Sequence, residues 1–412
     1  MSAFKKSTGL PYLILILITL LSCDKKDSDE NKIVTIGVLI PQTGSAASSG
    51  ESTNAALAIA LQDINRYLGD AGSDYRLEIR IKDTQTDTLV CIQKYNELKN
   101  EGVKLIIGPY SSAEVKALKP LADQDGILII SPSSVAISLA VAGDNVFRLA
   151  PDDLGQGEAM TALLIDDGIE VIVPVVRDDL WGNELLAATS DQFMNSGKEV
   201  VEPVKYTPGT TDFTALITTL VSNMNTVLSG YSPDKAGVYL ISFGEGTDIM
   251  RAASSKEPLN AIRWYGSSAY AENKSLIQDE MTSMFAMERQ LVCPIFGYDP
   301  NARSKWEPLI NELQTGLSRK PEIYALVAYD ALWLAIFTYL STGDEPDIMS
   351  LKETFTLQAN NYYGVTGWTT LNNAGDRALA TYDFWGIDWV LNTPLWAIKA
   401  SYNNATKELV RY

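Results

Sequence analysis

Residues 33–40 read IVTIGVLI, an apolar and largely β-branched run that Pro41 closes. A short run of this kind is typical of a strand that is buried on both faces. Residues 53–68 then place apolar side chains at helical spacing, and residues 75–81 indicate a second strand. The order strand, helix, strand predicts a βαβ unit and therefore a parallel sheet.

Outward from this unit, the same alternation continues through two successive segments of similar length. In the first segment we predict helices at 88–100 and 112–123 and strands at 103–107 and 127–130. In the second we predict helices at 154–167, 183–196 and 213–228 and strands at 171–176, 199–206 and 236–243. The sequence therefore predicts an α/β protein with two doubly wound parallel-sheet lobes that face a shared cleft. A helix pair at 306–317 and 322–341 and a β-rich stretch at 362–412 follow.

The composition narrows the classes of function. The chain has 412 residues with a formal net charge of −18, which is unfavourable for binding nucleic acid. It contains no histidine, and this removes the commonest general base and zinc ligand. The sequence also lacks a phosphate-binding loop, a nucleophile elbow and a metal-binding loop. We therefore expect no catalysis, no cofactor and no metal site.

The N-terminus has the pattern of an exported lipoprotein. Its apolar run at 10–21 spans about 18 Å as a helix, too short to cross a bilayer. We interpret residues 1–22 as a signal peptide and Cys23 as the lipidated first residue of the mature chain. Residues 23–32 are polar and acidic and predict a flexible tether. The alternative is an ordinary secretory signal without a lipid, and we expect no later segment to span a membrane.

Several smaller features have structural interpretations. We expect Cys91 and Cys293 to be buried free thiols, with a disulfide as the alternative. The adjacent acidic pairs at 152–153, 166–167 and 178–179 are expected in solvated turns, because neighbouring residues seldom converge on one site.

Seven stretches, taken in order, carry a resemblance to a known family. They are IGVLIPQTG (36–44), GPYSS (108–112), GILIISP (126–132), VFRLAP (146–151), DLWGN (179–183), YALVAYDA (324–331) and YGVTG (363–367). Together they resemble the type I periplasmic substrate-binding proteins of ABC transporters, in the leucine/isoleucine/valine-binding protein-like family. The resemblance covers about residues 33–400. It implies a type I periplasmic-binding fold with a three-segment hinge, crossed near residues 150, 296 and 365.

The same resemblance divides the chain into lobes. The N-terminal lobe would comprise residues 33–150 plus 297–365, and the C-terminal lobe residues 151–296 plus 366–412. The ligand-binding candidates are hydroxyl side chains at family contact positions and aromatic side chains near the cleft: Ser112, Ser133, Ser134, Ser268, Tyr110, Trp181, Phe243, Tyr270, Tyr298 and Tyr324. For each aromatic residue, core packing is the alternative.

Two of these positions depart from the family pattern. Ser268 stands where the family has an acid that pairs with a ligand ammonium, and Val135 stands where the family has a threonine. Burying an ammonium without an anionic partner costs several kcal/mol, by order of magnitude. The substitutions therefore favour a ligand with a carboxylate or amide and an apolar or aromatic part.

Taken together, these features predict an extracytoplasmic, lipid-anchored and monomeric binding protein. We expect it to capture a small polar ligand by hinge closure and to deliver the ligand to ABC permease subunits. One alternative is a ligand-sensing domain that signals to a receptor, which an adjacent permease and ATPase gene cluster would disfavour. A second alternative is a lipid-anchored enzyme of the same fold class, which a hydrolase screen would test.

Overall fold

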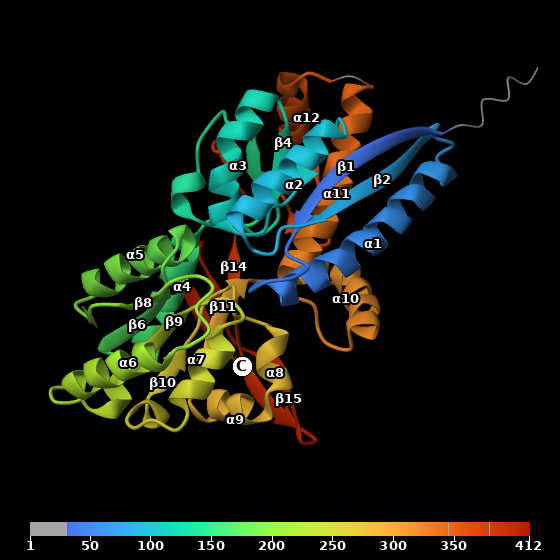
Figure 1. Cartoon of the computed structure of the whole chain (residues 1–412). Coiled ribbons are helices and arrows are strands. Elements are labelled where there is room, and N and C mark those ends of the chain that lie inside the picture. The colour runs from blue at the N-terminus through green and yellow to red at the C-terminus, as the bar shows by residue number, and fades with distance from the viewer. Residues whose placement is uncertain (1–30, 345, 379) are drawn as a thin grey trace, which may run out of the picture.

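The computed structural model describes residues 31–344, 346–378 and 380–412 and has two lobes, each built on its own sheet (Figure 1). The signal peptide predicted at 1–22 and the predicted lipidation site Cys23 lie outside the described residues. The two parallel-sheet lobes confirm the predicted fold class.

The first lobe has a five-stranded sheet in the order β2-β1-β3-β4-β5, with every pairing parallel. Its strands are β1 Lys32–Ile40, β2 Tyr75–Asp83, β3 Leu105–Ile107, β4 Leu128–Ser131 and β5 Val146–Arg148. Its helices are α1 Ala47–Asp70, α2 Thr88–Asn100, α3 Ser112–Asp125, α10 Arg303–Leu317, α11 Ile323–Thr342 and α12 Ile348–Asn361. Alternate strand residues pack on opposite faces, as the two-residue period of a strand requires. Val38 and Ile107 belong to the large core with α1 and α11, whereas Leu39 and Ile106 pack with α2 and α3.

The second lobe has a nine-stranded sheet, in the order β16-β15-β14-β11-β10-β9-β6-β7, with β8 also paired to β6. Its parallel strands are β6 Val171–Arg177, β7 Glu199–Val200, β8 Val204–Tyr206, β9 Ala236–Ile241, β10 Arg263–Tyr265 and β11 Val292–Phe296. Antiparallel strands extend it: β14 Thr381–Val390, β15 Thr393–Asn403 and β16 Glu408–Arg411. Its helices are α4 Asp153–Asp166, α5 Leu180–Asn195, α6 Thr214–Val227, α7 Gly246–Ala253, α8 Lys274–Gln278 and α9 Glu280–Glu288.

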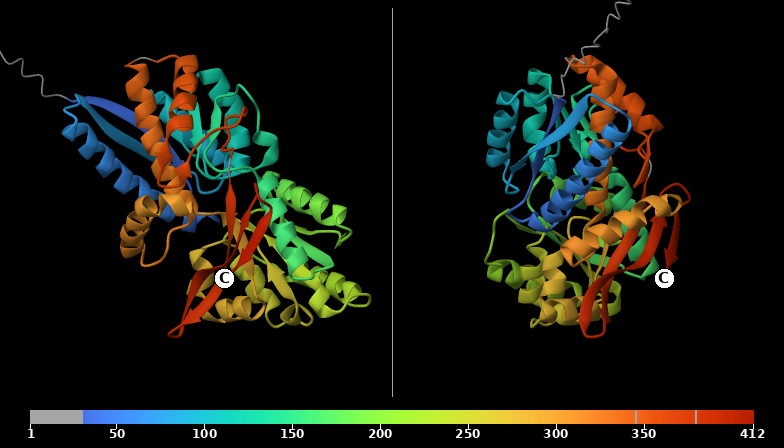
Figure 2. Two further views of the ribbon diagram at one scale, coloured as in Figure 1. Left: turned by 180° about the vertical axis from the view of Figure 1, so that it is seen from behind. Right: turned by 90° about the vertical axis from the view of Figure 1, so that its right-hand side faces the viewer.

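Three segments connect the lobes. The chain passes from β5 into α4, from β11 back to α10, and from the short hairpin of β12 Tyr363–Gly364 and β13 Gly367–Trp368 into β14. Before it reaches β14, the third segment runs beside β5, where Arg148 and Asp376 form a two-pronged ion pair at 2.6 and 2.7 Å. Figure 2 shows the C-terminal strands (red) descending from this hinge into the second lobe.

Most predicted elements are present, with shifts that have physical causes. The helix predicted at 53–68 begins earlier, at Ala47. The strand predicted at 199–206 is divided into β7 and β8 on either side of Pro203, which has no N–H to donate to the sheet. Cys91 and Cys293 are buried and unpaired, which confirms that prediction.

Helix α11 is one element that the sequence analysis described incompletely. By length and composition it is apolar enough to cross a membrane, although we expected no such segment after residue 22. Most of its side chains are buried, and it packs against α1 and α12. Its apolar composition is therefore explained by its place in the core of the first lobe.

Candidate ligand-binding site

The first-lobe wall of the cleft is formed where β3 and β4 end. Ser112 is the first residue of α3, and its Oγ accepts hydrogen bonds from the N–H groups of Val135 (3.3 Å) and Ala136 (3.1 Å). The Ser134 Oγ donates a third hydrogen bond to the same oxygen, at 3.1 Å. Ser133 donates to the carbonyl of Tyr110 at 2.9 Å. Three donors therefore hold the Ser112 oxygen, and its own hydroxyl hydrogen is left to point to a ligand at the N-terminus of α3, where the helix dipole favours an anionic group.

A buried arginine fixes this wall. Arg148 is fully enclosed, and its Nη1 donates to the carbonyl of Ala136 at 2.6 Å while Asp376 neutralises its charge. An arginine fork held by a carboxylate has little conformational freedom. The backbone that presents Val135 and Ala136 to Ser112 is therefore held rigidly, from behind, by the hinge.

The second-lobe wall is aromatic. Trp181, in the first turn of α5, lies 5.0 Å from Phe243 between ring centroids, and their planes are inclined by 31°. The guanidinium of Arg177 lies over the Phe243 ring at 4.5 Å. Although burial opposes its charge, Glu245 and Asp179 raise the pKa of Arg177 above its usual value. Arg177 therefore supports the aromatic wall as a fixed cation, with its charge already paired.

Two tyrosines complete the cleft. Tyr110 meets Phe243 and Tyr324 edge to face, at centroid distances of 6.3 and 6.2 Å. Burial raises the pKa of both tyrosine hydroxyls, so that both remain protonated at neutral pH. The Tyr110 hydroxyl donates to Ser49 at 3.0 Å. The rings of the first lobe thus contact those of the second directly across the cleft.

The space enclosed by these walls is small and uncharged. Ten residues line it: Tyr110, Ser111, Ser112, Ser133, Val135, Trp181, Phe243, Ser268, Ala269 and Tyr324. None of the ten carries a charge, and the free volume among them is about 10 Å³, room for roughly one water molecule. The structure therefore represents a closed form, which a larger ligand can enter only when the lobes separate.

The structure brings most of the predicted site residues together. Seven of the ten candidates line the cavity, and Ser134 touches it through Ser112. Tyr270 instead packs behind the second-lobe wall, where its hydroxyl meets Thr247 at 3.0 Å. Tyr298 lies beside Trp306 and Trp385, away from the cavity. For these last two tyrosines the structure favours the core-packing alternative.

Sequence reasoning missed two residues near the cleft. Ser49 reaches Tyr110 because α1 begins six residues earlier than its apolar spacing indicated. Asp153 was expected in a solvated turn, but it is 1% exposed and its Oδ2 has no hydrogen-bond partner among the described residues. Burial raises the pKa of Asp153 well above its usual value. The solvated-turn interpretation also fails for Asp167, which is buried against Arg263 and Arg411. In each case residues distant in sequence bury the carboxylate, and the local sequence pattern does not predict this burial.

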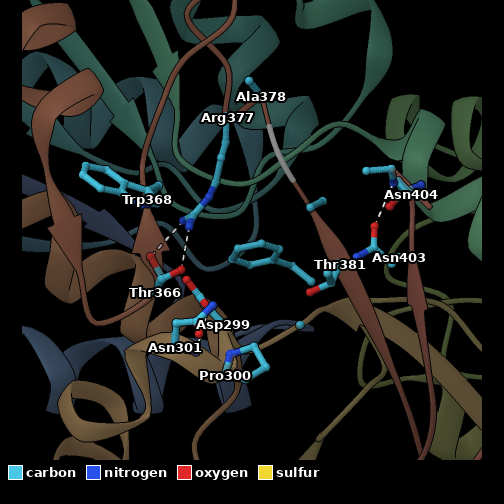
Figure 3. Close-up of a pocket in the computed structure, with 14 residues that line it drawn as sticks. Asp299, Pro300, Asn301, Thr366, Trp368, Arg377, Ala378, Thr381, Asn403 and Asn404 are labelled. Carbon is cyan, nitrogen blue, oxygen red and sulfur yellow. Dashed lines mark hydrogen bonds between the residues drawn. The ribbon is translucent and has the colours of Figure 1, made fainter. Parts of the chain in front are cut away.

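A larger cavity, of about 550 Å³, lies at the hinge and shares no lining residue with the cleft. Figure 3 shows Arg377 extending across it towards Thr366, to which it donates at 2.8 Å (Oγ1) and 2.6 Å (carbonyl). Thr366 donates in turn to the buried Asp330 at 2.6 Å. Burial lowers the pKa of Arg377 to about 10, and the charge of Asp330 opposes this effect. The opposite charges of Arg377 and Asp330 are therefore linked through Thr366, and we assign this network a structural role in the hinge. Among the described residues, no three His, Cys, Asp or Glu side chains come together as a metal site.

Comparison with known proteins identifies the family. The family described as "Periplasmic binding protein" matches residues 33–242, slightly more than half of the chain. The chain belongs to the periplasmic binding protein family. It is therefore an extracytoplasmic substrate-binding protein and not an enzyme, and the resemblance to the periplasmic binding proteins noted in the sequence is confirmed.

Relatives of this binding protein extend over most of its length. An uncharacterized protein of Methanocaldococcus jannaschii is 27% identical over 377 residues, which are 87% of this chain and 88% of that protein. A leucine-binding protein of Thermotoga maritima shares the fold with a TM-score of 0.74 at 18% identity, covering 90% of this chain and 99% of that one. A solute-binding protein of R. palustris, solved with benzoate, has a TM-score of 0.70 at 16% identity, covering 89% and 96%.

Proposed function

We propose that this protein is a lipid-anchored binding protein that closes on a small carboxylate or amide with an apolar or aromatic body and presents it to an ABC permease. The observation that carries the proposal is the cleft itself: the Ser112 hydroxyl on the first lobe and the aromatic rings on the second line one cavity, and no charged residue lines it. The hydroxyl suits an oxygen of a carboxylate or amide, and the rings suit an apolar or planar body.

The absence of charge in the cavity lining narrows the ligand class. An α-amino acid bound there would bring an ammonium into a cavity whose ten lining residues include no acid. Glu245, the nearby acid, is already paired with Arg177 at 2.6 Å and with Tyr206 at 3.0 Å. Among the relatives, one binds leucine and another was solved with benzoate, so both ligand classes occur in this fold. The cleft chemistry favours the second class.

A thermal-shift screen tests the ligand class. The protein would be tested against benzoate, 3-phenylpropanoate, 4-methylpentanoate and their amides, with phenylalanine, leucine, glycine and alanine alongside. We expect the largest stabilisation from a carboxylate or amide with an apolar body, because at equal concentration a tighter ligand raises the free energy of unfolding more, with the logarithm of its affinity. Stabilisation by glycine or alanine, whose side chains offer nothing to stack on Trp181, would contradict the proposal.

The anchor has its own test. Cys23→Ala in the full chain is expected to move the protein out of the membrane fraction after signal cleavage, because lipid chains supply about 0.8 kcal/mol per buried CH₂. A Cys91→Ala variant, which changes a buried thiol, is the control and should stay with the membrane. Membrane association of the cleaved Cys23→Ala variant would overturn the lipoprotein assignment.

A further inference from the structure

Lys320 reaches from one lobe into the other at a place remote from the cleft cavity. It lies in the loop between α10 and α11, which pack against α1 in the first lobe. Its Nζ lies 3.8 Å from the centroid of the Trp385 ring, on β14 of the second lobe, and 4.7 Å from that of Tyr298. Figure 2 shows α10 (light orange) at the boundary between the lobes, beside the C-terminal strands. Lys320 thus forms an interlobe contact.

The surroundings of the Lys320 ammonium contain two buried carboxylates. Glu272 Oε1 lies 3.8 Å from Nζ, and neither oxygen of Glu272 has a hydrogen-bond partner among the described residues. Asp383 is buried within reach of the Lys320 charge, although not in direct contact with it, and accepts the N–H of Tyr298 at 3.1 Å. A buried carboxylate without hydrogen bonds is costly unless a cation compensates it.

The backbone around this acid is also strained. Glu272 has a φ of +58°, in the left-handed region that non-glycine residues seldom adopt. Such a conformation costs on the order of 1 kcal/mol or more and persists where the surroundings fix it. Burial raises the pKa of Glu272 to about 8, against the opposing charge of Lys320, and burial lowers the pKa of Lys320. The strained backbone and the desolvated side chain of Glu272 indicate that the fold keeps this residue in place to contact a charged partner.

Two ring faces and the oxygens of two buried carboxyl groups around one nitrogen are the chemistry that recognises an ammonium. We propose that Glu272, Asp383 and Trp385 of the second lobe, with Tyr298 from the crossover that follows β11, form an ammonium-binding cage, and that Lys320 fills this cage when the lobes are closed. A contact made only in the closed form shifts the population towards it. The cage therefore contributes to closure whatever the cleft holds, and its chemical class of ligand is a primary alkylammonium.

A small amine has a route to the cage, and the chain supplies a matched control. Glu272 and Lys320 line a cavity of about 490 Å³ that opens to solvent. Lys274 makes a second interlobe ion pair, with Glu51 at 2.8 Å, but these side chains are 32% and 44% exposed. Lys274 and Glu51 line the same cavity, but the Lys274 ammonium faces no aromatic ring among the described residues. Removing Lys274 therefore tests whether an open acidic cavity binds an amine without the two ring faces.

Chemical rescue tests the proposal on the full chain. Lys320→Ala is expected to lower Tm, and ethylammonium chloride should then raise Tm saturably. The expected rise is about 1 °C, the shift that ~1 kcal/mol gives in a protein of this size. Sodium chloride at equal ionic strength should give no saturable shift. Wild type and Lys274→Ala should show no saturable response to ethylammonium. Equal responses in all three proteins would overturn the proposal, whereas a failure of ligand binding in the cleft would leave this result unchanged.

A second measurement applies if Lys320→Ala does not fold. In wild-type protein whose lysines carry ¹³C-methyl groups, the Lys320 resonance should lie well upfield of the others, because Nζ sits over the Trp385 ring. Lys320→Arg, which keeps the cation, assigns the resonance by removing it. A spectrum with no upfield lysine methyl signal would contradict the cage.

Discussion

The cleft and the Lys320 cage are both aromatic and both join the two lobes, but they differ in charge. The cleft is lined by hydroxyls and rings without a charged residue, whereas the cage places two acidic side chains, Glu272 and Asp383, near a lysine. The difference indicates a division of labour. Cation recognition is used within the chain to bring the lobes together, and the ligand cavity is left neutral for a group that hydrogen bonds can satisfy.

We expect the largest losses of stability and ligand binding from changes in the aromatic wall of the cleft. Trp181→Ala should destabilise the protein by about 3–5 kcal/mol, the usual cost of truncating a buried tryptophan, and should weaken binding of the best carboxylate from the screen at least tenfold. Trp368→Ala, at a side chain that is 52% exposed, is the control and should cost far less. Urea denaturation and calorimetry provide the two measurements. Equal losses in both variants would show that Trp181 has no special role.

The donor wall should contribute the next largest effect. Ser112→Ala removes the oxygen around which the N–H groups of Val135 and Ala136 are arranged. We expect binding of the same carboxylate to weaken by about 1–3 kcal/mol, or roughly 5- to 150-fold, measured by calorimetry. The exposed Ser196→Ala should leave the affinity unchanged. An unchanged affinity in Ser112→Ala would place the ligand oxygen elsewhere.

A negative charge introduced into the cleft should raise its affinity for an ammonium. Ser268→Glu places a carboxylate in the cavity at the position where the family carries one. The ratio of phenylalanine affinity to 3-phenylpropanoate affinity should then rise about tenfold or more, because an opposite charge favours a buried ammonium. Ser268→Gln, which has the same shape without the charge, is the matched control. A ratio that does not rise would mean that the ligand's α-carbon lies away from Ser268.

A pH-dependent prediction concerns the charge of the cage. The pKa of Glu272 is raised by burial to about 8, so the folded protein keeps a proton that the unfolded chain loses near pH 4.5. The folded state binds more protons in this window, and the free energy of unfolding should therefore fall as pH rises from about 4.5 to 8. Glu272→Gln should show a shallower fall, measured by urea denaturation at pH 5 and 7.5. Parallel curves for the two proteins would refute the shifted pKa.

Much of the fold could be predicted from sequence, because hydrophobic periodicity and the residues that end helices and strands are local features. The run at 33–40 became β1, and the helix predicted at 88–100 has the same bounds in α2. Ser112 and Trp181, which were chosen by their positions in the family, both line one cavity. These predictions succeeded where the determining interactions lie within a few residues, or where a resemblance carries the long-range pairing.

The remaining features depend on partners that sequence spacing does not reveal. The sequence around Asp153 predicts a solvated turn, but packing between distant segments buries its side chain. Tyr298 reads as a cleft aromatic, but it faces Lys320 because its backbone is hydrogen-bonded to Asp383, 85 residues away. Tertiary enclosure decides these positions, and no local pattern encodes it.

On this evidence the cleft binds a carboxylate and needs no ammonium. Calorimetric titration with two matched pairs measures this preference: leucine with 4-methylpentanoate, and phenylalanine with 3-phenylpropanoate. Each pair differs mainly in the α-amino group. We predict that, in the pair that binds, the acid without the amino group binds as tightly as the amino acid or more tightly. An amino acid that binds more than tenfold more tightly than its partner, or no binding by either carboxylate, would contradict the account.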